Sequence, residues 1–181
     1  CANFAKYFID TNSTIFPEKA STRDFFDCKI NWVNCQESDL RTTFWQEIDQ
    51  LFEEDQESQK GGFAVSDICV IAGSITSGSL IEHELTKKNI KCISTFSDNK
   101  LAEGYKRTHN ENMKKMYFFK NDARVKITTI HSFKGFEATR LLILVNPKTS
   151  GQLLYTALTR IIGTERGSSV TVINSDAKYN N

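Results

Sequence analysis

The apolar positions of this chain follow two patterns, one typical of helices and one typical of buried strands. Six apolar residues recur at intervals of three and four, with acidic residues on the other face, and predict an amphipathic helix ended by Gly61-Gly62: Leu40, Phe44, Trp45, Ile48, Leu51 and Phe52. Short continuous apolar runs at 67–72 and 141–145 are typical of strands that are buried on both faces of a parallel sheet.

Further strands and helices alternate along the chain. The pattern predicts strands within 25–33, 90–95, 125–130 and 169–174, and helices over 2–9, 79–88 and 153–162. In the helix over 79–88, Lys87 and Lys88 complement the helix dipole and Asn89 suits a left-handed cap. Residues 97–124 are polar apart from the apolar patch 117–119, so we expect a loop or a reduced insertion there. The alternation predicts a doubly wound parallel α/β sheet, in which ligands bind beyond the carboxyl ends of the strands.

Length and composition fit one soluble domain. A chain of 181 residues, with 39% apolar and 25% charged residues, can build one well-formed core, so we expect a single domain over 1–181. No apolar stretch is long enough for a membrane span, and we expect no membrane partner. The five cysteines form no C-x-x-C pair, which favours reduced thiols over disulfides or a metal site. The chain starts at Cys1 without a signal-peptide pattern, so we expect a fragment of a cytoplasmic protein.

The charges are separated along the chain. Residues 36–60 contain eight acidic and two basic residues, a net charge of −6, and predict an acidic surface. Residues 87–126 contain eleven basic and four acidic residues, a net charge of +7. A basic segment of this kind favours a polyanion such as nucleic acid, although a solvated lysine-rich face explains the charge equally well.

A glycine-rich loop at 73–80 follows a strand and has the glycine spacing of a P-loop. A P-loop needs Lys and then Ser or Thr after its second glycine, but Ser79 and Leu80 stand there. The run at 141–145 also ends in Asn146 rather than in an acidic pair that would hold Mg²⁺. We therefore expect that this chain cannot hydrolyse a nucleoside triphosphate by itself.

The strongest constellation lies at 128–137, with the sequence TTIHSFKGFE, and is followed 23 residues after Glu137 by Arg160 in YTALTR. The pattern T-x-H-x-x-K-G-x-E resembles motif V of UvrD/Rep-like superfamily I DNA helicases, and Y-x-A-L-T-R resembles their motif VI. The segments DICVIAG and IEHEL also resemble the strand and the I-E-x-x-L helix that precede motif V in that family. The resemblance covers about residues 60–175. It implies the second, C-terminal RecA-like domain, a parallel sheet flanked by helices without its own P-loop.

The resemblance assigns nucleotide contacts to three residues. Arg160 carries a permanently charged, planar guanidinium and would act as an arginine finger on the γ-phosphate of ATP. Gly135 would allow close approach of the backbone, and Glu137 would accept hydrogen bonds from ribose hydroxyls. ATP and Mg²⁺ would be held mainly by an N-terminal RecA-like domain of the same chain, encoded upstream of Cys1. Outside this motif, Arg160 would be interpreted as a surface arginine in a weak ion pair.

Four further residues are candidates for contacts with single-stranded or partly duplex DNA: Thr129, His131, Ser132 and Lys134. Hydroxyls and an imidazole at a strand end suit hydrogen bonds to a nucleic-acid backbone. Lys134 before Gly135 resembles the UvrD/Rep branch, which implies translocation from 3′ to 5′. Only 39 residues separate Leu85 from Val125, so the large insertion found in that family is reduced or missing. Two alternatives stay open: a degenerate helicase-like module that binds nucleic acid or a partner without ATPase activity, and an unrelated α/β protein.

Overall fold

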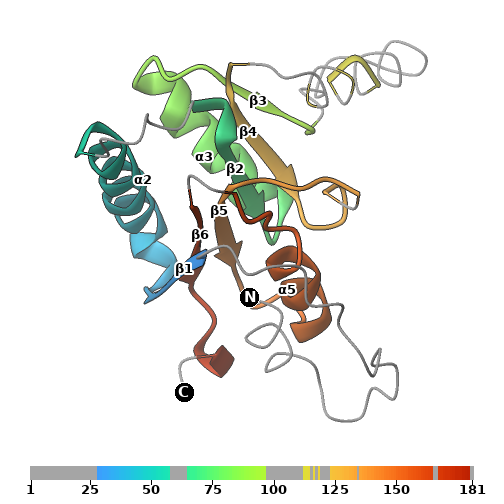
Figure 1. Ribbon diagram of the computed structural model, residues 1–181. Coiled ribbons are helices and arrows are strands. Elements are labelled where there is room, and N and C mark those ends of the chain that lie inside the picture. Colours follow the sequence, from blue (N-terminus) through green and yellow to red (C-terminus); the bar gives the residue numbers. More distant parts are fainter. Residues whose placement is uncertain are drawn as a thin grey trace.

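The protein forms a sheet of six parallel strands in the order β1-β6-β5-β2-β4-β3, flanked by helices (Figure 1). The computed structural model describes residues 28–57, 65–96, 112–114, 116, 118, 123–133, 135–164 and 167–179. The strands are β1 (Cys28–Asn34), β2 (Ile68–Ala72), β3 (Cys92–Ser94), β4 (Val125–Thr129), β5 (Arg140–Val145) and β6 (Ser168–Asn174). Three α-helices have bounds within the described residues, α2 (Leu40–Glu57), α3 (Ile75–Lys87) and α5 (Gly151–Leu158), and residues 112–114, 116 and 118 are also helical. This architecture confirms the predicted fold class, a parallel sheet flanked by helices.

The helices cover both faces of the sheet (Figure 1). On one face, the apolar stripes of α2 and α3 pack on alternate residues of β2, β4 and β5, with Phe44, Ile48, Ile81 and Leu85 fully buried. On the other face, α5 and the loop after β4 pack on the remaining strand residues. Every residue of β2 is buried, because the strand is covered on both sides. The continuous apolar runs are therefore the consequence of a sheet enclosed between two layers.

Helix α3 begins four residues earlier than the apolar pattern predicts. Ser74 caps it, and its side chain accepts a hydrogen bond from the amide of Ser77 at 3.2 Å. The loop predicted at 73–80 therefore ends at Ser74. The other end of α3 matches the prediction, since Asn89 has a positive φ of 58° and the Ile90 amide bonds the Leu85 carbonyl at 2.9 Å.

A cluster of polar and charged side chains around Glu84 joins α2 to α3. The carboxylate of Glu84 is bonded by Arg41 at 3.2 Å, by Lys87 at 3.3 Å and by the indole of Trp45 at 3.4 Å, while the ammonium of Lys88 lies 3.6 Å from the Trp45 ring centroid. Burial opposes ionisation, but the hydrogen bonds from Trp45 and Lys87 and the nearby charges lower the pKa of Glu84. Lys87 and Lys88 thus have structural contacts beyond the helix dipole.

Other predictions have mixed outcomes. Helix α5 ends at Leu158 rather than at 162, so Thr159 and Arg160 form a turn. The cysteines at 28, 35, 69 and 92 are free, and burial raises the pKa of the Cys69 thiol. The predicted helix over 2–9, the stop at Gly61-Gly62 and most of the loop over 97–124 lie outside the described residues. Among the helices that are described, none has the length and apolar character needed to cross a membrane.

Candidate functional site

The first part of the candidate site is a turn at the carboxyl end of β4. The Thr129 hydroxyl donates to Ser132 Oγ at 3.2 Å and accepts from the Ser132 amide at 3.4 Å, and the Phe133 amide donates to the Thr129 carbonyl at 3.0 Å. A threonine that ends a strand can stabilise such a turn with its own hydroxyl. His131 and Ser132 are exposed at the surface of this turn. Three of the four predicted nucleic-acid contacts are therefore neighbours, while Lys134 lies outside the described residues.

The turn adjoins a pair of hydroxyls, one from a buried and one from a half-buried threonine. Thr128 is fully buried, and its hydroxyl lies 2.8 Å from that of Thr95, directly after β3. The Thr95 amide also bonds the carbonyl of Ile127 at 3.1 Å. The ends of β3 and β4 are therefore joined through both backbone and side-chain atoms. Thr95 carried no motif, and sequence reasoning missed it.

The loop continues through Gly135 to Glu137. Gly135 has a φ of 91°, a conformation that side chains with a Cβ rarely adopt, and a Cβ placed there would meet no atom within 4 Å. The requirement for glycine therefore comes from the backbone, while the space beside it is open. Glu137 is exposed two residues later. This geometry is compatible with a ligand that approaches the Gly135 backbone.

A backbone bridge joins this loop to the turn after α5. The Ala138 amide donates to the Arg160 carbonyl at 3.1 Å, and the Ile162 amide donates to the Ala138 carbonyl at 2.9 Å. The side chain of Arg160 is half-buried, and its Nε donates to the Thr156 carbonyl at 3.3 Å. The bridge thereby brings the backbone segments of Glu137 and Arg160 side by side, although the two residues are far apart in sequence.

The structure separates the candidate residues into two groups at opposite ends of the sheet. Strand β2 pairs Ala72 with Thr129 at one end and Ile68 with Arg140 at the other. Four residue steps of about 3.3 Å place the two ends roughly 13 Å apart along the strand direction. Thr129, His131 and Ser132 lie at the carboxyl end, as expected, whereas Glu137 and Arg160 lie near the amino end of β5. Ligands of such sheets usually bind beyond the carboxyl ends of the strands, and Glu137 and Arg160 lie away from that edge.

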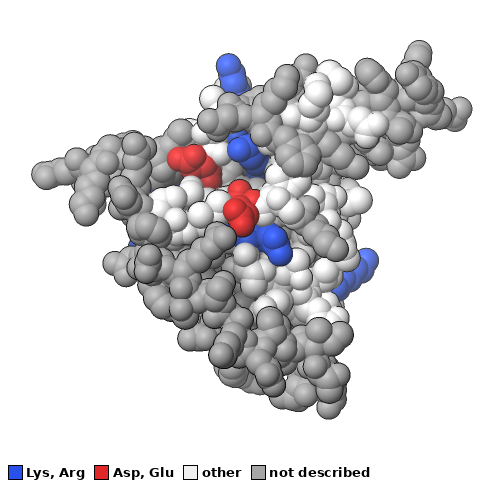
Figure 2. Space-filling model, turned by 45° about the vertical axis from the view of Figure 1, so that its right-hand side comes forward, with Lys and Arg blue, Asp and Glu red and all other residues white. Residues whose placement is uncertain are grey.

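A hollow of about 220 Å³ lies beside Glu137. Its lining includes three phenylalanine side chains and the charged residues Asp67, Lys126 and Glu137. The Lys126 ammonium donates to the Ser66 carbonyl at 3.3 Å. Figure 2 shows acidic and basic side chains gathered near the centre of the face on the α5 side. The amino-end part of the site therefore has charges of both signs beside apolar side chains.

The glycine-rich loop packs against the protein itself. A Cβ on Gly73 would lie 2.3 Å from Thr149 Oγ1, and a Cβ on Gly78 would lie 2.2 Å from Cζ of Phe96. Asn146, at the end of β5, accepts hydrogen bonds from the Lys148 amide at 3.0 Å and the Thr149 hydroxyl at 3.2 Å. The side chains of Thr149 and Asn146 thus lie close to Gly73 at the carboxyl ends of β2 and β5, where such sheets usually bind a ligand. Both glycines are explained by packing.

Most described basic residues of the segment 87–126 also have local partners. Lys114 bonds the Phe96 carbonyl at 2.9 Å and Lys126 bonds the Ser66 carbonyl, in addition to the contacts of Lys87 and Lys88 with the α2–α3 cluster. For these four described lysines, the contacts favour a structural role over a nucleic-acid contact.

Among known proteins, only solved structures are similar to this chain. No protein-family model matches the chain, and no curated protein matches it in sequence. The C-terminal domain of a possible DNA helicase from Lactobacillus plantarum is 16% identical with a TM-score of 0.47, over 81% of this chain and 72% of that one. The C-terminal part of the Fun30 ATPase domain is 12% identical with a TM-score of 0.45, over 74% of this chain and 40% of that one. The E. coli DEAD-box protein SrmB, solved with regulator of ribonuclease activity A, is 8% identical with a TM-score of 0.48, over 84% of this chain and 79% of that one. At these sequence identities and TM-scores, the structural similarities carry no functional argument.

Proposed function

We propose that this chain is the C-terminal motor domain of an ATP-dependent DNA helicase or translocase of the UvrD/Rep kind. The observation that carries the proposal is the backbone bridge at Ala138, which brings Glu137 of the motif V-like segment beside Arg160 of the motif VI-like segment. These two motifs were identified separately in the sequence. Their meeting at one end of the sheet is what a shared nucleotide contact requires.

Arg160 would neutralise charge on the γ-phosphate of ATP held by the N-terminal domain. Its Nε is occupied by the Thr156 carbonyl, which fixes the direction of the side chain and leaves the terminal nitrogens for a ligand. Glu137 would accept hydrogen bonds from the ribose, and Gly135 would allow close approach of the nucleotide. Mg²⁺ would be held mainly by the N-terminal domain, as the family resemblance implies.

Single-stranded DNA would bind at the other end of the sheet. The exposed His131 and Ser132, with Thr129, present an imidazole and hydroxyls that can contact a phosphodiester backbone. One loop of eight residues, 130–137, connects this turn to Glu137. A movement of the turn that contacts DNA would therefore be transmitted through this loop to the nucleotide contact at Glu137, as a motor requires. The direction of movement, 3′ to 5′, rests on the family resemblance.

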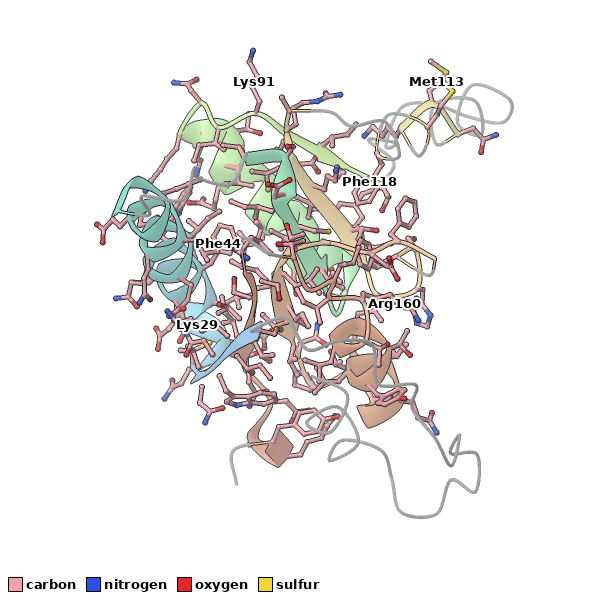
Figure 3. The ribbon with its side chains drawn as sticks, viewed as in Figure 1. Lys29, Phe44, Lys91, Met113, Phe118 and Arg160 are labelled. Carbon is pink, nitrogen blue, oxygen red and sulfur yellow. The ribbon has the colours of Figure 1, made fainter. Side chains whose placement is uncertain are left out.

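The test is ATP turnover by the full-length protein that contains this chain. We expect Arg160→Ala to lower the DNA-stimulated kcat by about a thousandfold or more, the usual effect of an arginine finger, with nucleotide binding retained. Arg160→Lys should not restore turnover, because an ammonium lacks the planar fork of donors. Lys29→Ala removes an exposed cation from β1 on the α2 side of the molecule and is the matched control (Figure 3).

Two results would argue against the proposal. Unchanged turnover in Arg160→Ala would remove the arginine finger from the mechanism. Binding of single-stranded DNA by a full-length protein that never hydrolyses ATP would instead support the alternative, a helicase-like module that binds nucleic acid without ATPase activity.

A further inference from the structure

Three phenylalanine rings, two of them in the loop that connects the two ends of the candidate site, pack together. The centroid of the Phe118 ring lies 5.2 Å from that of Phe136 and 6.5 Å from that of Phe133, both edge-on, and the Phe133 and Phe136 rings are stacked at 5.7 Å. Phe118 and Phe133 are each 2% exposed. Figure 3 shows Phe118 on the same side of the sheet as Arg160, opposite to Phe44 of α2.

Two of these rings belong to the loop itself, on either side of Gly135. The Phe133 amide bonds the Thr129 carbonyl, and the Phe136 amide bonds the Phe133 carbonyl at 3.0 Å. Phe133 is therefore tied to the turn that carries His131 and Ser132, and Phe136 directly precedes Glu137. A shift of the Phe136 backbone relative to the Phe133 backbone would therefore change the separation of the two predicted ligand contacts.

The third ring comes from a different segment. Residues 112–114, 116 and 118 are helical, so Lys114 and Phe118 are one turn apart on the same helical face. Lys114 bonds the Phe96 carbonyl at 2.9 Å, and Phe96 packs against Gly78 of α3. Met116, between them in sequence, is 43% exposed. The helical residues are thus fixed to the end of β3 by Lys114 and to the loop by Phe118.

We infer that Phe118 is a positioning residue that holds the loop 130–137 in the conformation linking the turn at Thr129 to Glu137. Its ring contacts both loop rings edge-on and is almost fully buried, whereas Met116, two residues earlier, is 43% exposed. Its consequence for ATP turnover rests on the proposed function, whereas its effect on the loop conformation does not. Aromatic edge contacts of this kind add to the stabilisation from buried area.

Amide hydrogen exchange of this chain tests the structural part. Phe118→Leu keeps an apolar side chain but loses the edge contacts, and we expect the amides of Phe133 and Phe136 to exchange at least about tenfold faster, as local opening becomes easier. Amides of Leu142 and Ile143 in β5 should not change. Met116→Ala is the matched control and should leave all four amides unchanged.

Two results would overturn the inference. One is loop exchange in Phe118→Leu that equals the wild-type rate. The other is equal acceleration of the loop and of β5, which would mean that the ring supports the whole fold. If Phe118→Leu does not fold, Phe118→Met replaces it, with the same expected difference between the loop and β5.

Turnover by the full-length protein tests the functional part. We expect Phe118→Leu to lower the stimulation of kcat by single-stranded DNA about tenfold, while the KM for ATP changes less than about threefold and basal turnover stays measurable. An equal loss of basal and stimulated turnover would contradict a role in linking the two contacts. The failure of the proposed function would be visible separately, as an Arg160→Ala variant with full turnover.

Discussion

Gly78 lies at the second glycine position of the P-loop-like sequence, and its substitution by alanine distinguishes packing from phosphate binding. A Cβ at this position would lie 2.2 Å from Cζ and 2.5 Å from Cε2 of Phe96, and 3.3 Å from the Cβ of Ala72. The Phe96 ring is 6% exposed, and its carbonyl is held by Lys114, so the ring has little room to move. Gly78→Ala therefore adds a methyl group to a filled space.

The expected magnitude follows from two opposing contributions. Glycine to alanine in an open helix position stabilises by about 1 kcal/mol. Inserting a methyl group into a packed core costs about 1–3 kcal/mol. We therefore expect a net loss near 1 kcal/mol in the free energy of unfolding, equivalent to about 2–4 °C in Tm for a domain of this size.

Urea unfolding followed by circular dichroism measures this change. Ser79→Ala is the control, because Ser79 is exposed in the same helix and the substitution should stabilise by a few tenths of a kcal/mol. In a double-mutant cycle, Phe96→Leu should relieve the clash and make Gly78→Ala less harmful by roughly 1 kcal/mol. If Gly78→Ala instead stabilised the protein by about 1 kcal/mol, as at an open site, the packing argument would be refuted.

Two further predictions concern the α2–α3 cluster and nucleic-acid binding. Hydrogen bonds and nearby cations outweigh burial and lower the pKa of Glu84 from its usual 4.5. The Glu84 carboxylate therefore contributes its full stabilisation of the fold above pH 4.5, and this stabilisation is lost as the pH falls through the lower pKa of the folded state. Glu84→Gln should therefore lower the unfolding midpoint at pH 7, with a difference that shrinks below pH 4.5, whereas a difference independent of pH would contradict the role of the charge. This chain should bind single-stranded DNA weakly, and fluorescence anisotropy should show about a tenfold loss of affinity between roughly 50 and 200 mM salt. Binding that does not respond to salt would exclude phosphate contacts as its source.

The fold could be predicted in large part, because its strands are marked by strong local patterns. The buried runs at 67–72 and 141–145 became the two central strands, and the stripe from Leu40 to Phe52 became α2. Asn89 had the predicted left-handed conformation. These features depend on residues close together in sequence, where periodicity and capping preferences apply directly.

The start of α3 and the end of α5 depended on tertiary contacts. Gly78 and Ser79 have poor helix propensity and suggested a loop, yet Ser74 caps the helix there and Phe96 occupies the space that glycine leaves. Helix α5 stopped at Leu158 because Arg160 and Ile162 use their backbone groups to bond Ala138. The Ser74 cap is a local signal, but no local pattern encodes the contact of Phe96 with Gly78 or the backbone bonds to Ala138.

The arrangement of the candidate site was also set by long-range contacts. The motifs indicated which residues to consider, but the pairing through β2 decided that Thr129 and Glu137 lie at opposite ends of the sheet. Phe118 carried one signal, since it belongs to the only apolar patch noted in the polar stretch 97–124. Its contact with Phe133 and Phe136 could be found only once the strands were assembled.

The central claim is that this chain provides one half of an ATP site. It is tested most directly by measuring ATP turnover, with and without single-stranded DNA, on the purified 181-residue chain and on the full-length protein side by side. We predict DNA-stimulated turnover by the full-length protein and none by the isolated chain, because the glycine-rich loop at 73–80 lacks the Lys and the following Ser or Thr that a P-loop needs. Turnover by the isolated chain at a rate similar to that of the full-length protein would contradict the claim.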